Sequence, residues 1–226
     1  MPEHHHSLQV HNLHPGLGRA YLLEYPQGMI LVDSGSRGEE RKVIRAMQRL
    51  GRSYLRLIFI THAHLDHYGS AAVLRRLTGA PVAIHRADAS DMSRAQTTVG
   101  QARGIGRIIR AVLPLAELLL RPEPLEADIL LEDGDDLAIA GLNAQVVHIP
   151  GHTPGSACLC VDDRLAFAGD LILTTQRPHV QELFAQDWSL IPYSLARLQA
   201  LHPQWVYPGH GDFPLNDDVL QKLEVR

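Results

Sequence analysis

Four short apolar runs in this chain are each followed at once by histidine or aspartate. "LIFI" precedes "THAHLDH", "VVHIPG" precedes His152, "LAFAG" precedes Asp170 and "WVYPG" precedes His210. Apolar runs of this length, bounded by turn residues, are typical of buried strands. Three of the four polar positions have glycine beside them, which lets the backbone turn sharply and leaves room near a bound group. The pattern predicts a sheet protein that presents these polar side chains at its strand ends.

The first part of the chain predicts alternating strands and helices, and the second part is rich in strands again. Strands are expected at "AYLLEY" (20–25), "MILVDSG" (29–35), "LRLIFITHAH" (55–64) and "PVAIH" (81–85). Helices closed by glycine are expected at 37–51 and 70–79, and a further helix at 194–201. Two β-rich halves that each carry helices predict an α/β protein built as a four-layer αββα sandwich.

Residues 86–124 differ from the rest, and we expect one domain over residues 1–226 with a helical insertion at about 86–124. Apolar residues recur there at mostly helical intervals, and Pro114 should kink or break the helix. We interpret the segment first as an amphipathic helical pair packed on the core. A lid over a pocket and a contact in a homodimer remain open as alternatives.

Net charge and the length of the apolar runs limit the kinds of partner that we expect. The formal net charge is −4, whereas nucleic-acid binders are more often basic, so we expect no nucleic-acid partner. No apolar run is long enough to span a membrane, and the N-terminus lacks the apolar core of a signal peptide. We therefore expect a cytoplasmic protein that acts on a small molecule, without a membrane partner. Cys158 and Cys160 are interpreted as small buried hydrophobic residues, and the run His4–His6 receives little weight as a metal site.

Histidine and aspartate at the strand ends point to metal chemistry. Imidazole nitrogen and carboxylate oxygen are ligands that suit Zn²⁺, Fe and Mn²⁺. Seven such residues exceed the needs of one tetrahedral metal and match two metals that share a bridging carboxylate. The seven are His62, His64, Asp66, His67, His152, Asp170 and His210.

Five motifs together resemble one known family, the metallo-β-lactamase-fold hydrolases. They are "ILVDSG", "THAHLDH", "PGHTPGS", "AGD" and "PGHG", in that family's order. The resemblance implies an αββα sandwich with two divalent ions, zinc before iron or manganese. It further implies that Asp66 takes part in catalysis as well as in metal binding. The implied ligands are His62, His64 and His152 for metal 1, Asp66, His67 and His210 for metal 2, and Asp170 as the bridge.

The residue at the implied bridging position, Asp170, limits the class of substrate that we expect. True metallo-β-lactamases carry cysteine or serine at this position, so Asp170 resembles the glyoxalase II-like, lactonase-like and phosphodiesterase-like branches. Because only a short stretch follows His210, we expect no helical C-terminal domain of the kind that a full-length glyoxalase II carries. We predict hydrolysis of a thioester, a lactone or a related ester by a metal-bridging hydroxide. A phosphodiesterase or nuclease, and an iron-dependent redox enzyme similar to persulfide dioxygenases, remain as alternatives.

Several further residues have a structural and a functional interpretation. Asp33 is interpreted first as a turn-capping carboxylate, with anchoring of a ligand imidazole as the alternative. Tyr68 and Tyr193 are interpreted as partly buried aromatic residues, with a hydrogen bond to a developing oxyanion as the alternative. Four histidines are expected to serve packing or the surface: His85, His148, His179 and His202.

Overall fold

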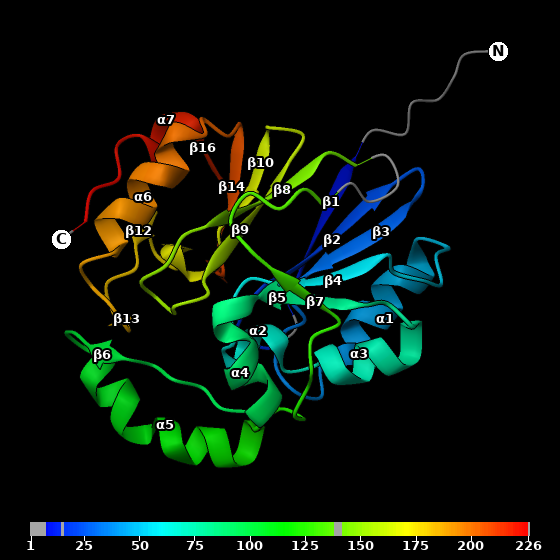
Figure 1. Ribbon diagram of the computed structural model, residues 1–226, viewed down its shortest axis with the longest axis horizontal. Coiled ribbons are helices and arrows are strands. Elements are labelled where there is room, and N and C mark those ends of the chain that lie inside the picture. The colour runs from blue at the N-terminus through cyan, green and yellow to red at the C-terminus, as the bar shows by residue number, and fades with distance from the viewer. Residues whose placement is uncertain (1–7, 15, 138–141, 226) are drawn as a thin grey trace.

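Two β-sheets lie face to face at the centre of the protein, as the computed structural model shows (Figure 1). It describes residues 8–14, 16–137 and 142–225. In the order of their pairing, the strands of the first sheet are β1 (Gln9–Leu13), β2 (Ala20–Tyr25), β3 (Gly28–Val32), β4 (Leu57–Ile60), β5 (Val82–His85) and β7 (Ile129–Leu131). Those of the second are β16 (Leu215–Asn216), β14 (Trp205–Tyr207), β10 (Leu165–Phe167), β9 (Ala157–Val161) and β8 (Ala144–His148).

Helices cover the outer face of each sheet. Near the first sheet lie α1 (Glu40–Arg49), α2 (Leu65–Tyr68), α3 (Ala71–Thr78) and α4 (Arg86–Arg94). The second sheet is covered by α6 (Ile191–Ala200) and α7 (Asp217–Leu220) (Figure 1). Three short groups of elements follow: a three-stranded sheet of β12 (His179–Val180), β11 (Ile172–Thr174) and β15 (His210–Gly211), the pair β13 (Phe184–Ala185) and β6 (Gln101–Ala102), and the 3₁₀ turn η1 (Gly169–Leu171). The longest described helix, α5 (Gly106–Leu120), completes the described chain.

Strand β2 shows how the sequence produces the layers. Leu22 points to the helices α1 and α3, whereas its neighbours Tyr21 and Leu23 point to the second sheet. Successive side chains of a strand point to opposite faces, so a strand buried on both faces is apolar at consecutive positions. A third apolar layer lies between the second sheet and α6, where Leu195 and Leu198 are buried. Three apolar layers between four layers of elements confirm the predicted αββα sandwich.

The helix α1 illustrates why the outer elements pack where they do. Val43 and Met47 are four positions apart, so they lie on one face of the helix, and both are buried against the first sheet. Glu40 in the first turn and Arg49 in the last complement the helix dipole. The predicted strand and helix order through β5 is confirmed, and the structure adds β1 and the one-turn helix α2.

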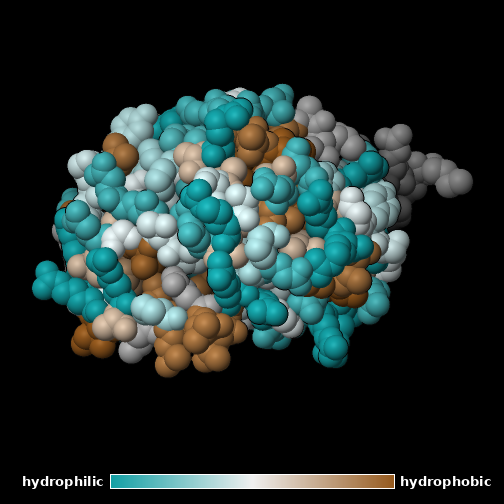
Figure 2. Space-filling view, turned by 60° about the horizontal axis from the view of Figure 1, so that its bottom comes forward, coloured by the Kyte–Doolittle hydropathy of each residue, from teal (hydrophilic) through white to brown (hydrophobic). Residues whose placement is uncertain are grey.

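The helix α5 departs from the expectation for residues 86–124. Of the two effects expected of Pro114, a kink or a break, the break does not occur: the helix continues through Pro114, and its ribbon bends along its length (Figure 1). It is not packed on the core as one of a helical pair. Much of its apolar surface is exposed, and Figure 2 shows apolar side chains gathered at the edge of the molecule where α5 lies. The exposed apolar residues include Ile105, Ile108, Leu115, Leu118 and Leu119.

Within the described ranges, every helix is too short or too polar to cross a lipid bilayer. The run His4–His6 lies outside the described residues. Cys158 and Cys160 are both buried in the apolar layer beneath α6 as free thiols, which confirms their interpretation as small hydrophobic residues.

Candidate metal centre

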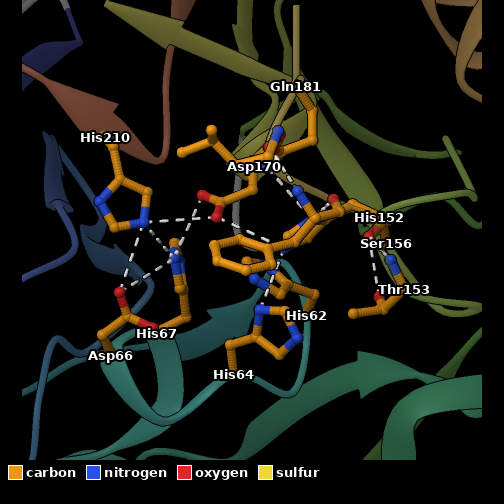
Figure 3. Close-up of polar contacts among 12 residues, drawn as sticks. His62, His64, Asp66, His67, His152, Thr153, Ser156, Asp170, Gln181 and His210 are labelled. Carbon is orange, nitrogen blue, oxygen red and sulfur yellow. Dashed lines mark hydrogen bonds and ion pairs between the residues drawn. The ribbon is translucent and has the colours of Figure 1, made fainter. Parts of the chain in front are cut away.

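The seven predicted residues meet at one edge of the two sheets, where several strands end (Figure 3). His62 and His64 lie two and four residues after the end of β4, and the helix α2 begins at Leu65, so that Asp66 and His67 lie in its single turn. The remaining three come from the second half of the chain. His152 follows β8, Asp170 lies in η1 after β10, and His210 begins β15.

The ligand-type atoms form two groups. In the first group, all donor atoms lie within 4.8 Å of one another, and its members are His62, His64, His152 and Asp170. The second group satisfies the same limit and consists of Asp66, His67 and His210. Oδ2 of Asp66 lies 3.3 Å from Nε2 of His210 in this second group. Two neighbouring groups of nitrogen and oxygen donors could therefore hold two metal ions.

Asp170 lies between the two groups. Its Oδ2 atom is 3.4 Å from Nε2 of His152 and 3.3 Å from Nε2 of His210. Its Oδ1 atom is 3.3 Å from Nε2 of His67. One carboxylate thus faces imidazoles of both groups, which is the position that a bridging ligand requires.

Hydrogen bonds to the outer ring nitrogens orient the imidazoles of the first group. Nδ1 of His152 donates to the carbonyl oxygen of Phe184 at 3.0 Å, and Nε2 of His64 donates to that of Thr98 at 3.3 Å. Each donation places the proton on the outer nitrogen, so Nε2 of His152 and Nδ1 of His64 present lone pairs to each other at 3.0 Å. Two lone pairs at this distance repel each other, and a cation between them removes the repulsion.

Two buried polar atoms at the centre lack a hydrogen-bond partner among the described residues, namely Nε2 of His62 and Oδ1 of Asp170. Buried polar atoms are nearly always satisfied, and an unsatisfied one calls for a water molecule or an ion. His62 is 1% exposed and Asp170 7% exposed. A divalent cation would satisfy a nitrogen lone pair and a carboxylate oxygen at once, so the residues present fit a metal ion.

Burial and neighbouring charges shift the pKa values of the histidines at the centre in different directions. Burial lowers the pKa of His62 and of His64, and it lowers the pKa of His152 to about 4. These three imidazoles are therefore neutral near pH 7, the form that binds metal. Burial acts to lower the pKa of His67 and of His210, but the neighbouring carboxylates, Asp170 first among them, together outweigh burial and raise both pKa values.

Asp33 holds one imidazole in place from outside the centre. Its Oδ2 atom accepts a hydrogen bond from Nδ1 of His67 at 2.8 Å, and its Oδ1 atom accepts one from the backbone N–H of Thr61 at 2.8 Å. The Thr61 hydroxyl donates to Asp33 and lies 3.0 Å from Nδ1 of His62. The preferred interpretation of Asp33 as a turn cap is wrong, because its carboxylate binds across to the ligand segment; the alternative of an imidazole anchor is confirmed.

Asp88 was not predicted from the sequence, although it joins the two halves of the centre. Its Oδ2 atom accepts from the backbone N–H of Ala63 at 2.9 Å and from the hydroxyl of Thr153 at 2.7 Å. Its Oδ1 atom accepts from the backbone N–H of Gly155 at 2.6 Å. Burial raises the pKa of Asp88 in spite of these bonds. One buried carboxylate therefore fixes the segments that carry His62 and His152 against each other.

Gln181 was also missed, and it supports the bridge position. Its side-chain amide donates to the backbone carbonyl of Asp170 at 3.2 Å, and its carbonyl oxygen accepts from the backbone N–H of Leu183 at 2.9 Å. Gly209 contacts the carboxylate of Asp170 itself. A Cβ atom at that position would overlap Oδ1 of Asp170, so only glycine leaves room for the carboxylate.

The two tyrosines and the four remaining histidines singled out in the sequence lie in different environments. Tyr68 is 1% exposed within the first apolar layer, so it is a core residue. Tyr193 is 54% exposed on α6 instead of partly buried. The four histidines assigned to packing or the surface lie outside both donor groups, and the ring of His85 stacks on that of His148 with the ring centres 4.0 Å apart.

The chain is similar to known proteins over most of its length. The family model of the metallo-β-lactamase superfamily matches residues 14–210. A probable metallo-hydrolase of Bacillus subtilis, YflN, is 26% identical over 223 residues, which is 89% of this chain and 83% of that protein. The hydroxyacylglutathione hydrolase GloC of Haemophilus influenzae is 29% identical over 143 residues, covering 63% of this chain and 60% of that protein.

A solved structure extends the likeness to the whole fold. TTHA1623, determined in a di-iron-bound form, superimposes with a TM-score of 0.69 at 27% identity, over 95% of this chain and 97% of that one. The family match covers most of the chain, and the named relatives are hydrolases. The protein is a metal-dependent hydrolase that belongs to the metallo-β-lactamase superfamily.

Proposed function

We propose that the protein is a dinuclear hydrolase that cleaves a thioester, a lactone or a related ester of a small molecule. The position of Asp170, which faces imidazoles of both donor groups at 3.3 and 3.4 Å, carries this proposal. A single-metal enzyme needs no carboxylate shared by two groups. The name of the relative GloC supports a thioester, since hydroxyacylglutathione is one.

Each side chain has a role in this proposal. The first ion would be held by His62, His64 and His152, the second by Asp66, His67 and His210, and both by Asp170. Zinc is the ion that we expect first, with iron or manganese as alternatives, because an all-nitrogen-and-oxygen site accepts each of them. When bound, the two ions would supply Lewis acidity, which lowers the pKa of the attacking water and polarises the carbonyl oxygen of the substrate.

Asp66 is the candidate proton acceptor. Its carboxylate lines the cavity in front of the centre, and its side chain is 16% exposed, more than that of Asp170. An oxygen of Asp66 that faces the cavity can take the proton released by the attacking water and pass it to the leaving group. Asp33 and the carbonyl oxygens of Phe184 and Thr98 keep the imidazoles in orientation.

We further propose that residues 1–226 form one metallo-hydrolase domain in which 86–124 is an insertion. The cytoplasmic location and the homodimer stay predictions.

Metal analysis combined with a small substrate panel tests the proposal. The purified protein is stripped with a chelator, reloaded with zinc, iron or manganese, and assayed on thioesters, homoserine lactones, bis-nitrophenyl phosphate and β-lactams. We expect two ions per chain, and turnover of a thioester or a lactone that is lost on chelation and restored on reloading. One iron per chain with oxygen uptake on a persulfide would contradict the proposal, as would a preference for the phosphodiester.

A further inference from the structure

A cavity of about 370 Å³ lies in front of the candidate metal centre. His64, Asp66, His152, Asp170 and His210 form the wall on the side of the centre. Val99, Ile109, Leu113, Leu120 and Phe184 are among the residues that complete the lining. The volume is at the low end of the range of about 300–1,000 Å³ for pockets that bind small molecules.

The lining lacks the groups that a charged substrate arm would need. Apart from the candidate ligands, the described side chains that line the cavity are apolar except for Thr97, and none of them is a lysine or an arginine. A phosphate or carboxylate placed against this wall would lose its hydration without gaining a charged partner. A hydrocarbon group gains free energy there, because each methylene removed from water favours binding about fourfold.

Three side chains of α5 provide much of the apolar wall. Ile109, Leu113 and Leu120 are four and seven positions apart, so they share the face of the helix that looks toward the centre. Ile108 belongs to the other face and is 68% exposed. The inward row is thus available to a ligand, because it contacts the cavity and is not embedded in one of the three apolar layers.

Both ends of α5 are fastened to the body of the protein. Before the helix, β6 pairs with β13, and Arg103 donates a backbone hydrogen bond to the carbonyl oxygen of Leu183 at 2.9 Å. After the helix, Nε of Arg121 donates to the carbonyl oxygen of Ala95 at 3.2 Å. These contacts hold the inward row of α5 at a fixed place opposite the metal centre.

From this arrangement we propose that the cavity beneath α5 binds an aliphatic acyl chain. The substrate is then an ester or thioester of a medium-length fatty acid, and Ile109 and Leu113 contact its chain. This inference rests on the proposed function, since the carbonyl carbon at the head of that chain is the atom attacked at the centre.

A series of thioesters with one leaving group tests the inference. N-acetylcysteamine thioesters from acetyl to decanoyl are assayed with the metal-loaded protein. We expect kcat/KM to rise with chain length until the cavity is full, by up to about fourfold per methylene. Turnover without any rise from acetyl to octanoyl overturns the inference and leaves the proposed function intact. If no thioester in the series is cleaved, the acyl assignment fails; the proposed function fails with it only if the lactones of the substrate panel are not cleaved either.

Two neighbouring residues of α5 provide a matched pair of variants. Ile109→Gln places an amide in the cavity, whereas Ile108→Gln places the same group on the exposed face. We expect the ratio of octanoyl to acetyl kcat/KM to fall by about tenfold in Ile109→Gln and to stay within about twofold of wild type in Ile108→Gln. Equal ratios in the two variants would overturn the placement of the chain beneath α5.

A binding measurement gives a readout that does not depend on turnover. The S-ethyl and S-octyl thioethers of N-acetylcysteamine lack the carbonyl group and are titrated calorimetrically. We expect the octyl compound to bind wild type and Ile108→Gln tighter than the ethyl compound by about tenfold or more, with that advantage lost in Ile109→Gln. Equal affinity of wild type for the two compounds overturns the inference.

Discussion

Oδ2 of Asp33 lies 2.8 Å from Nδ1 of His67, although the two residues are 34 positions apart in the chain. Asp33 follows β3 and His67 lies on α2, and the parallel pairing of β3 with β4 brings them together. The contact places the proton of His67 on Nδ1 and turns Nε2 toward the centre. A residue outside both donor groups thus decides which nitrogen of the imidazole is available.

Replacing Asp33 by asparagine tests this orientation. Asparagine keeps the shape but has one acceptor oxygen, so it cannot serve both Thr61 and His67 as the carboxylate does. We expect the affinity for the second metal ion to fall by about 10- to 100-fold. A competition titration with a chromogenic chelator measures it. Asp163→Asn, at an exposed turn, is the control. Unchanged affinity in Asp33→Asn would show that the anchor is dispensable.

Asp88→Asn should destabilise the fold more than any surface change on the same helix. The amide nitrogen of asparagine would face at least one of the N–H groups of Ala63 and Gly155, which the carboxylate now accepts. Leaving a buried donor unsatisfied costs about 1–3 kcal/mol of unfolding free energy. Urea denaturation followed by circular dichroism checks this.

The matched control is Asp91→Asn on the same helix. Its carboxylate pairs with Arg94 at 3.5 Å near the surface, and such pairs contribute about 0–1 kcal/mol. An equal loss of stability in the two variants would mean that the hydrogen bonds of Asp88 contribute little.

Gly209→Ala is expected to disturb the bridge position while leaving the sheets intact. The added Cβ would overlap Oδ1 of Asp170 and push the carboxylate away from the imidazoles. We expect bound metal, measured by elemental analysis, to fall below one ion per chain. Gly134→Ala is the control, because its Cβ would meet no atom within 4 Å and only its positive φ of 83° adds strain. Two ions retained in Gly209→Ala would remove Asp170 as the bridge.

Removing a proposed metal ligand should abolish activity without unfolding the protein. We expect Asp170→Ala and His152→Ala each to abolish turnover, since both side chains belong to the first donor group. The circular dichroism spectrum should stay that of wild type, because the three apolar layers do not include these residues. Full activity in either variant would contradict the proposed mechanism.

The ligand-type residues could be predicted because each follows an apolar run of strand length. His152 and Asp170 are conspicuous in the sequence for that reason, and the sandwich brings the ends of those strands to one edge. The strand β1 was missed because "QVHNL" mixes polar and apolar residues and is only partly buried at the edge of the sheet. A partly exposed edge strand lacks the continuous apolar signal of a central one.

The roles of other residues around the centre could not be predicted, because their neighbours in the sequence do not indicate that they are buried there. Asp88 lies in "RADASD", a sequence typical of a solvated helix, and only the tertiary structure buries it against Ala63 and Gly155. The face of α5 that lines the cavity could not be assigned either, because its apolar residues extend beyond that face and include the exposed Ile108 and Leu115. Periodicity identifies a helix face only where polar residues mark the opposite side.

The two donor groups combine side chains from residues 62–67 with side chains from residues 152–210. During synthesis, the first four emerge from the ribosome well before Asp170 and His210 exist. An ion captured early would meet imidazoles and one aspartate but no bridge. If the two ions bind as proposed, both can be loaded stably only after the second sheet, which brings Asp170 and His210, has packed on the first.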